Sequence, residues 1–172
     1  MNMQPLIELI VDDNIVLRPY SPADIDAIFN LIDRNRKHLS QYGDDTSYKY
    51  PTRESVAESI ENSLNPNKLR LGIWVRGTTY VGAINLAPFS PRKAELGGYL
   101  GEEFQGNGYV TRSVERVVSH AMGKGGFDLG VLAKVHMDNA ASRSVLKRCG
   151  FRNLGKRDNA SHFWYGIGKL VC

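Results

Sequence analysis

Cysteine is scarce in this chain. Cys149 and Cys172 are the only two among 172 residues. A disulfide framework and a cysteine-based zinc cluster both need more thiols than that, so neither is available to this protein. So low a cysteine content fits a reducing compartment, and we expect a cytoplasmic location.

Long apolar runs are missing as well. No stretch approaches the roughly 20 consecutive apolar residues of a membrane span, and the first residues lack the basic-then-apolar plan of a signal peptide. Hydrophobic residues make up 42% and charged residues 23% of the sequence, as in an ordinary globular protein. With no repeat, low-complexity tract or linker visible, we expect one domain over residues 1–172 and no membrane partner.

The charge is unevenly distributed along the chain. Residues 1–60 carry 6 Lys and Arg against 10 Asp and Glu, a balance of −4, whereas residues 61–172 carry 16 against 8, a balance of +8. A basic C-terminal part suits an anionic partner such as a phosphorylated cofactor or a nucleic acid. Nucleic-acid motifs and interleaved aromatic residues are absent, so we expect no nucleic-acid partner.

Hydrophobic periodicity predicts a mixture of strands and helices. Strands are expected at residues 15–18, 69–75, 80–86, 94–100, 131–137, 151–154 and 162–167. Helices are expected from Pro22, from Thr52 or Ser55 to about Leu64, over residues 110–121 and over residues 141–149, with a loop at residues 40–50. The order predicts an α/β (α+β) fold on a largely antiparallel sheet, with Phe29, Trp74, Phe89 and Trp164 in the core.

Residues 105–111, which read QGNGYVT, follow a predicted strand and open a predicted helix. The first amide N–H groups of a helix have no helical partner, and glycine leaves room for a phosphate to approach them. A Walker A string is absent, and Thr111 stands where a dinucleotide-binding loop needs a third small residue. The pair Gly106 and Gly108 therefore predicts a phosphate site of another kind.

Two segments resemble the RimJ/RimL-like branch of the GNAT superfamily of N-acetyltransferases. Residues 95–111 (ELGGYLGEEFQGNGYVT) resemble its strand, loop and helix, where the form Q-G-x-G-Y-[AV]-T is usual. Residues 138–151 (DNAASRSVLKRCGF) resemble its D-N-x-x-S stretch and the G-F that follows. The resemblance extends from Ile15 to Ile167 and implies a GNAT-type mixed sheet, in which the parallel strands 94–100 and 131–137 splay apart, with flanking helices.

The resemblance implies acetyl-coenzyme A as co-substrate and no metal. It assigns the pantetheine arm to the strand edge near Leu100–Glu102 and to Asn139, and the pyrophosphate to the amides that follow. The implied cofactor-binding residues are Leu100, Gly101, Glu102, Gln105, Gly106, Asn107, Gly108, Tyr109, Val110, Asn139 and Ser142. Weaker candidates for the cofactor's phosphates are Arg112, Arg143 and Arg148.

The implied reaction is attack of a neutral amine on a thioester, which needs a base, an oxyanion donor and an acid. Many GNAT enzymes use a tyrosine as the acid, but Leu146 stands at that position. The branch offers Ser142 as a hydrogen-bond donor to the sulfur instead. Glu95 is the first choice for the base, with His136 or a water chain as alternatives.

The acceptor is the least defined part of the prediction. The resemblance assigns its wall to His38, Tyr42 and Asp44, although the Trp-rich segment usual in this branch is missing there. We expect a primary amine, first of all the α-amine of a protein N-terminus of the ribosomal type. A small amine (polyamine, amino acid or antibiotic) and a non-catalytic acetyl-coenzyme A sensor are alternatives, and the chain is expected to be a monomer or a homodimer.

Overall fold

A computed structural model describes residues 7–62 and 68–167. Its sheet has eight strands in the order β1-β2-β3-β4-β5-β6-β8-β7, and only β5 and β6 run parallel. The strands are β1 Leu9–Ile10, β2 Ile15–Arg18, β3 Leu69–Val75, β4 Thr79–Ser90, β5 Lys93–Leu100, β6 Gly130–His136, β7 Arg152–Arg157 and β8 Ala160–Gly166. The predicted mixed, largely antiparallel sheet is confirmed.

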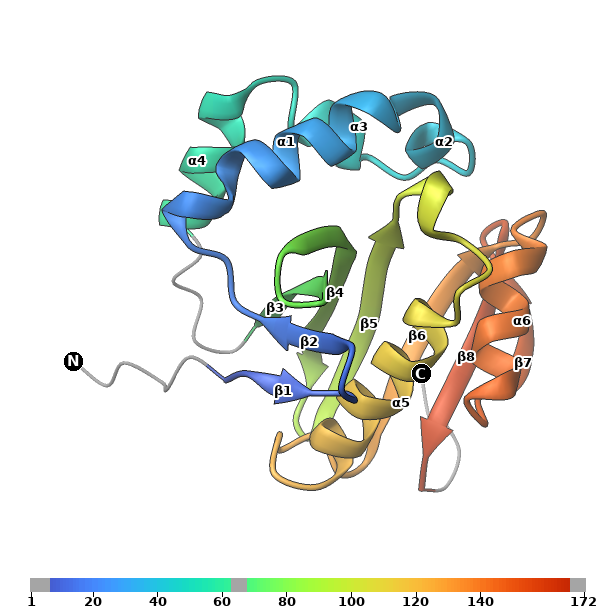
Figure 1. The fold of residues 1–172 in the computed structure, drawn as a ribbon. Coiled ribbons are helices and arrows are strands. Elements are labelled where there is room, and N and C mark those ends of the chain that lie inside the picture. The colour runs from blue at the N-terminus through green and yellow to red at the C-terminus, as the bar shows by residue number, and fades with distance from the viewer. Residues whose placement is uncertain (1–6, 63–67, 168–172) are drawn as a thin grey trace.

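Helices cover both faces of this sheet (Figure 1). The helices are α1 Ile25–Arg34, α2 Arg36–Ser40, α3 Thr46–Lys49, α4 Arg53–Glu61, α5 Tyr109–Met122 and α6 Ala140–Arg148, with short 3-10 turns η1 Pro22–Asp24 and η2 Glu102–Phe104. Helices α1 to α4 form one layer, which we call the helical cap, and α5 and α6 lie on the opposite face.

Apolar periodicity accounts for the two layers. In α5, Val114, Val117, Val118 and Ala121 recur at helical spacing and pack on the even-numbered side chains of β5, such as Leu96. In α1, Ile28, Leu31 and Ile32 pack with Trp74 and Tyr80 on the other face. The two faces of β5 therefore look toward different helices, which gives the sheet a separate environment on each side.

The structure corrects several sequence expectations. Residues 40–50 are not only loop, because α2 ends at Ser40 and α3 forms after the turn. Strand β1 was not predicted, since two residues carry too little periodicity. Phe89 is 45% exposed rather than buried, because β4 extends past the sheet core, whereas Trp74 and Trp164 are buried as expected. Leu64 lies outside the described residues.

Helix α4 begins as the sequence suggested. Of the two proposed starts, Thr52 is the N-cap, and its hydroxyl oxygen accepts a hydrogen bond from the amide of Ser55 at 3.2 Å. At the start of the helical cap, the Asp24 carboxylate is buried and accepts two hydrogen bonds from Arg18, at 2.8 and 2.9 Å. This pair ties the first turn of the helical cap to strand β2.

Candidate active site

The parallel strands β5 and β6 pair over only part of their length. The pairing runs from Lys93 opposite Gly130 to Leu96 opposite Ala133. Beyond that point Gly97–Leu100 pair only with β4, and Lys134–His136 only with β8. The facing backbone edges of the two strands are therefore left without each other as partners, and the predicted splay is confirmed.

In the loop after β5, the backbone at Gly106 and Gly108 has free space around it. Gly106 and Gly108 have φ angles of +78° and +71°, a conformation that side chains other than glycine rarely adopt. A Cβ at Gly106 would meet no described atom within 4 Å, and one at Gly108 only Arg112 Nε at 3.8 Å. Because the first helical bond of α5 joins the Arg112 amide to the Gly108 carbonyl, the amides of residues 109–111 have no helical partner.

Hydrogen bonds within the loop, and one bond to a distant segment, hold this loop in place. Asn107 Nδ2 donates to the carbonyls of Phe104 and Gln105 at 3.1 and 3.2 Å. Arg112 donates from Nη2 to the Asn107 carbonyl at 3.1 Å and from Nη1 to Asp12 Oδ2 at 2.5 Å. Burial alone would raise the pKa of Asp12, but hydrogen bonds from two backbone amides and from Arg112 lower it overall. Arg112 is thus a support of the loop, rather than a free surface arginine.

Helix α6 begins beside the splayed end of β6. Asn139 is its N-cap, and its Oδ1 accepts a hydrogen bond from the Ser142 amide at 3.0 Å. Ser142 lies in the first turn and is half-buried. Leu146, which replaces the usual phenol, is 4% exposed and packs in the core. Asn139 and Ser142 of the second motif therefore lie close to the splayed end of β6.

The two other arginine candidates are also bonded within the chain. Arg143 Nη1 donates to the Met137 carbonyl at 2.9 Å, while its buried Nε has no partner among the described residues. Arg148 Nη2 reaches Thr111 Oγ1 on the first turn of α5, at 3.4 Å. Arg148 therefore lies close to the unpaired amides of α5, where an anion would bind.

The model of the acetyltransferase (GNAT) domain matches residues 14–152. The chain belongs to this family. It is accordingly an acetyl-coenzyme A-dependent N-acetyltransferase, and the recognition from the two sequence motifs is confirmed.

Individual relatives agree with this assignment. The "Putative ribosomal N-acetyltransferase YdaF" of Bacillus subtilis strain 168 is 26% identical over 153 residues, covering 85% of this chain and 82% of that protein. The fold matches RimL, the ribosomal L7/L12 α-N-protein acetyltransferase solved with coenzyme A, with a TM-score of 0.82, 19% identity and coverage of 94% and 98%. It also matches the microcin C7 self-immunity acetyltransferase MccE, solved with acetyl-coenzyme A and AMP, with a TM-score of 0.76, 21% identity and coverage of 91% and 94%.

Two of the three expected acceptor residues of this GNAT enzyme contact β6 or the loop after β5 from the helical cap. His38 Nε2 lies 3.2 Å from Gln105 Nε2, in the loop between β5 and α5. The ring of Tyr42 stacks on that of His136, with 5.7 Å between centroids and 28° between planes. Nδ1 of His136 accepts a hydrogen bond from the Asp138 amide at 3.2 Å. Tyr42 and His136, candidates for different roles, are thus brought into contact.

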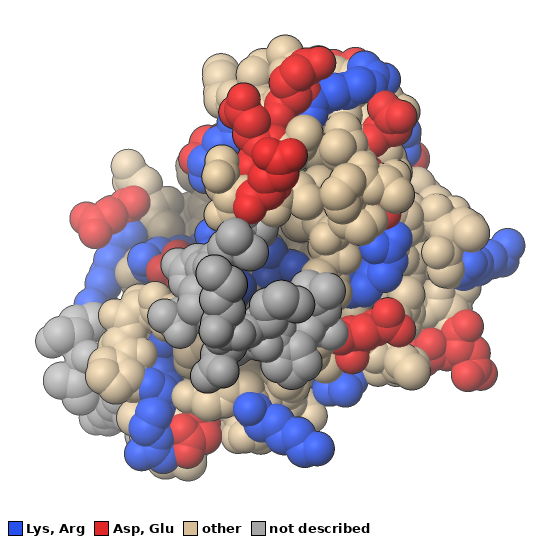
Figure 2. Space-filling model, turned by 90° about the vertical axis from the view of Figure 1, so that its left-hand side faces the viewer, with Lys and Arg blue, Asp and Glu red and all other residues tan. Residues whose placement is uncertain are grey.

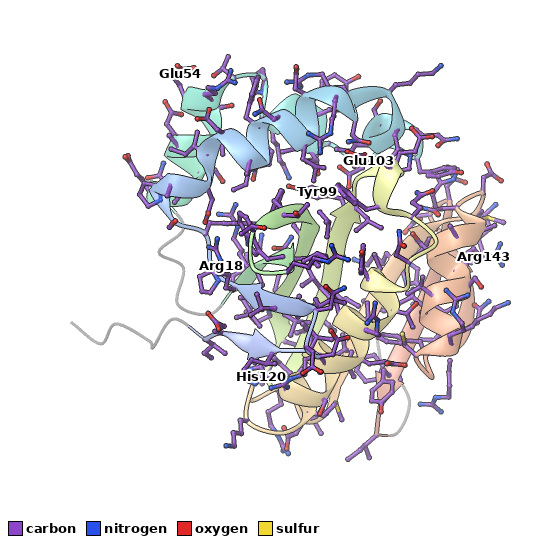
Figure 3. The ribbon with its side chains drawn as sticks, in the orientation of Figure 1. Arg18, Glu54, Tyr99, Glu103, His120 and Arg143 are labelled. Carbon is purple, nitrogen blue, oxygen red and sulfur yellow. The ribbon has the colours of Figure 1, made fainter. Side chains whose placement is uncertain are left out.

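Asn35, which has no role in the sequence prediction, joins the helical cap to the segment that follows β5. Asn35, between α1 and α2, is 4% exposed. Its Oδ1 accepts a hydrogen bond from the Glu102 amide at 2.8 Å, and its Nδ2 donates to the Leu31 carbonyl and to Glu103 Oε2 at 2.9 and 3.0 Å. Figure 3 shows Glu103 directly below the helical cap. Glu102 and Glu103 lie 67 and 68 positions away along the chain, so no local motif signals these two contacts.

Gly101 and Glu102, two of the residues implied to bind the pantetheine arm, use their backbone amides in hydrogen bonds within the protein. The Gly101 amide donates to the Val81 carbonyl at 2.9 Å, and the Glu102 amide is taken by Asn35. The edge of β5 that faces the splay ends before them, at Leu100. The backbone donors that remain for a pantetheine arm on this strand therefore lie within Gly97–Leu100.

Glu95 lies in the paired half of β5, opposite Leu132 of β6. Its Oε2 is ion-paired with Lys134 Nζ at 2.8 Å, and its side chain is 36% exposed. It shares the face of β5 on which Tyr99 lies, because the two residues are four positions apart on one strand. The carboxylate is therefore on the side of the helical cap, which is the side expected for the acceptor.

A cleft of about 460 Å³ lies between the helical cap and the sheet. Its walls are Tyr20, Ile28, Asp44, Asp45, Thr46, Lys49, Tyr50, Val56, Ser59, Ile60, Asn62, Lys68, Arg70, Asn85, Gly98 and Tyr99. Gly98 and Tyr99 belong to the splayed part of β5, so the cleft extends to the splay. Of the three predicted acceptor residues, only Asp44 lines it.

The floor of the cleft contains neutral phenols. Tyr99, labelled in Figure 3 beneath the helical cap, shares a hydrogen bond with Tyr80 between hydroxyl oxygens 2.8 Å apart. Burial raises the pKa of Tyr20 to about 12 and raises the pKa of Tyr80 and of Tyr99 as well. These groups stay protonated at neutral pH, so the charges in the cleft come from its acidic and basic side chains.

Proposed function

We propose that this enzyme acetylates the α-amine of a protein N-terminus. The observation that carries the proposal is the cleft, which is open, lined mainly by polar side chains, and continuous with the splayed end of β5. A flexible chain end fits such a cleft, whereas a small amine is usually held in an enclosed pocket. The ribosomal relatives named above support this acceptor class, and a ribosomal-protein acceptor also implies a cytoplasmic location.

The described residues fit acetyl-coenzyme A, which supplies the acetyl group as a thioester. The free edge of β5 at Gly97–Leu100 would bond the pantetheine arm from one side and Asn139 Nδ2 from the other, since only Oδ1 of Asn139 is used as a cap. The open backbone of residues 105–111 would hold the pyrophosphate, because the unpaired amides and the positive end of α5 attract anions.

Ser142 and Glu95 complete the proposal. The Ser142 hydroxyl is the donor to the departing thiolate, because it lies in the first turn of α6 beside the splay and Leu146 offers no phenol. Glu95 receives the proton of the incoming ammonium group, directly or through water, from the acceptor side of β5. Lys134 would hold the Glu95 carboxylate in place.

A thiol-release assay tests the acceptor class. Acetyl-coenzyme A is offered with peptides that begin with Ser, Ala or Met, with the same peptides blocked at the N-terminus, and with polyamines and free amino acids. We expect turnover of the free peptides only, and mass spectrometry should place the acetyl group on the α-amine. Turnover confined to the small amines would reject the proposal.

The role of Glu95 is tested by the pH dependence of the rate. Glu95→Gln should lower kcat by about 10²-fold near neutral pH and recover in part as the pH rises, since more of the amine is then already unprotonated. Lys134→Gln breaks the same ion pair but keeps the carboxylate, so its kcat should fall much less. A profile for Glu95→Gln parallel to that of the unchanged enzyme, with an equal limiting rate, would point to His136 or to water.

A further inference from the structure

Acidic side chains line the end of the cleft near the splay, and basic side chains line the end farther from it. Asp44 and Asp45 lie just after Tyr42, whose ring stacks on His136 at the splayed end of β6. Asp44 Oδ1 accepts the Thr46 amide at 2.7 Å, and Asp45 is ion-paired with Lys49 at 2.8 Å. Asp44 therefore keeps one carboxylate oxygen for a cation. The acidic end of the cleft is the end nearest to the splay.

The basic end lies across the sheet. Arg70 of β3 is opposite Asn85 of β4, and Asn85 is opposite Gly97 of β5, so one row crosses three strands. Because neighbouring strands are about 4.8 Å apart, Arg70 is roughly 10 Å from Gly97. Lys68 lines the same wall and is exposed. Figure 2, which views the molecule from the side of α4 and β3, shows acidic and basic side chains interspersed on this face.

The polar groups at this basic end are held firmly. Arg70 donates from Nη1 to the Ser59 carbonyl at 2.9 Å, and from Nη2 to Ser59 Oγ at 2.8 Å and to Tyr50 Oη at 3.2 Å. Between the two ends, Asn85 Oδ1 is buried and has no hydrogen-bond partner among the described residues. Such an acceptor is available to an N–H donor, and a peptide amide in the cleft would supply one.

We propose that the cleft selects protein N-termini with an acidic side chain in the first two residues. This inference rests on the proposed function and adds the substrate class. The α-ammonium group passes Asp44 to reach the splay, a peptide amide bonds Asn85 Oδ1, and the carboxylate of the acceptor lies near Lys68 and Arg70. Two extended residues of the acceptor span roughly 7 Å. The acidic side chain of the acceptor and the side chain of Lys68 or Arg70 cover the rest of the roughly 10 Å between Gly97 and Arg70.

The test compares three peptides that differ only at the second residue: Ser-Glu, Ser-Gln and Ser-Lys. We expect kcat/KM to be about tenfold higher for Ser-Glu than for Ser-Gln, mainly through KM, and lowest for Ser-Lys, because a hydrogen bond to a charged group is stronger than a neutral one. The preference should weaken as salt is added, since Lys68 is exposed.

Lys68→Glu reverses one charge on the surface and leaves the buried network alone. It should bring the ratio of kcat/KM for Ser-Glu to kcat/KM for Ser-Gln to about one or below. The matched control is Lys124→Glu, an exposed lysine after α5 on the other layer, which should keep the original ratio. If both variants lost the preference for Ser-Glu over Ser-Gln, the preference would come from the net charge of the protein, and the inference would be overturned.

The remaining outcomes separate this inference from the proposed function. Equal kcat/KM for the three peptides would overturn the acidic preference alone, because N-terminal acetylation itself would stand. Free glutamate as the only substrate, with no peptide acetylated, would overturn the proposed function and the inference together.

Discussion

The expected cofactor side of the splay (the loop after β5 and the start of α6) and its expected acceptor side (the helical cap) differ in how far apart in the sequence their contacting residues lie. On the cofactor side the contacts of the two motif asparagines are local: Asn107 bonds Phe104 and Gln105, and Asn139 caps the amide of Ser142, all within three residues. Arg112 adds one long-range contact there, to Asp12. On the acceptor side they join distant segments, as in Asn35 with Glu102, 67 positions away. Local contacts form whenever a short motif is present, whereas distant ones depend on the whole fold. The acceptor side can therefore change while cofactor binding is kept.

The largest effect is expected on the cofactor side, at Ser142. Ser142→Ala should lower kcat by about 10²-fold with little change in the Kd of coenzyme A, because the hydroxyl acts mainly as charge develops on the sulfur. Steady-state kinetics and calorimetry measure the two quantities. Ser144→Ala, an exposed serine on the same helix, is the control. Equal kcat for both variants would remove Ser142 from the reaction.

The proposed phosphate site in the loop after β5 is tested at Gly108. Gly108→Val should raise the Kd of acetyl-coenzyme A by about tenfold or more, because it strains a backbone at φ +71° and places a side chain where the pyrophosphate would lie. Gly77→Val carries the same strain at φ +73° in the turn between β3 and β4, where a Cβ meets no described atom within 4 Å. If both variants bound the cofactor equally well, the phosphate site would lie elsewhere.

The acceptor side is tested at Asn35. Asn35→Ala removes a buried side chain together with its hydrogen bonds to Glu102, Glu103 and Leu31, which should lower the free energy of unfolding by about 1–3 kcal/mol. The KM of the acceptor should rise more than the Kd of coenzyme A, because the loop at residues 105–111 keeps its own bonds. Thermal unfolding and kinetics provide the readouts. Asn30→Ala, on the exposed face of α1, should change neither KM nor Kd.

The same contrast explains what the sequence could predict. Two short motifs predicted the loop after β5 and the splay of β5 and β6. They contain Gly106, Gly108, Asn139 and Ser142, whose positions relative to one another are set by residues nearby in the chain. The hydrogen bond of Asn35 with Glu102 and the stacking of Tyr42 on His136 bring together residues far apart in the chain. No periodic pattern in the sequence indicates either contact. The cleft draws on β3 and β4 as well, strands whose alternating pattern indicates only a sheet.

The stability of the helical cap should depend on pH through Asp24. Burial would raise the pKa of Asp24, but hydrogen bonds from Arg18 and Ser21 outweigh it and lower the pKa overall.

A lowered pKa in the folded state means that Asp24 stabilises the fold above its unfolded pKa of about 3.9 and loses this effect as the pH falls through the folded value. Asp24→Asn should therefore lower the free energy of unfolding by about 1–2 kcal/mol at pH 7, and the difference from the unchanged protein should disappear in acid. Denaturant titrations at several pH values measure it. Asp26→Asn, which breaks an exposed pair with Arg53, should lose at most about 0.5 kcal/mol. A constant difference for Asp24→Asn down to pH 2 would show that packing, rather than charge, holds the start of the helical cap.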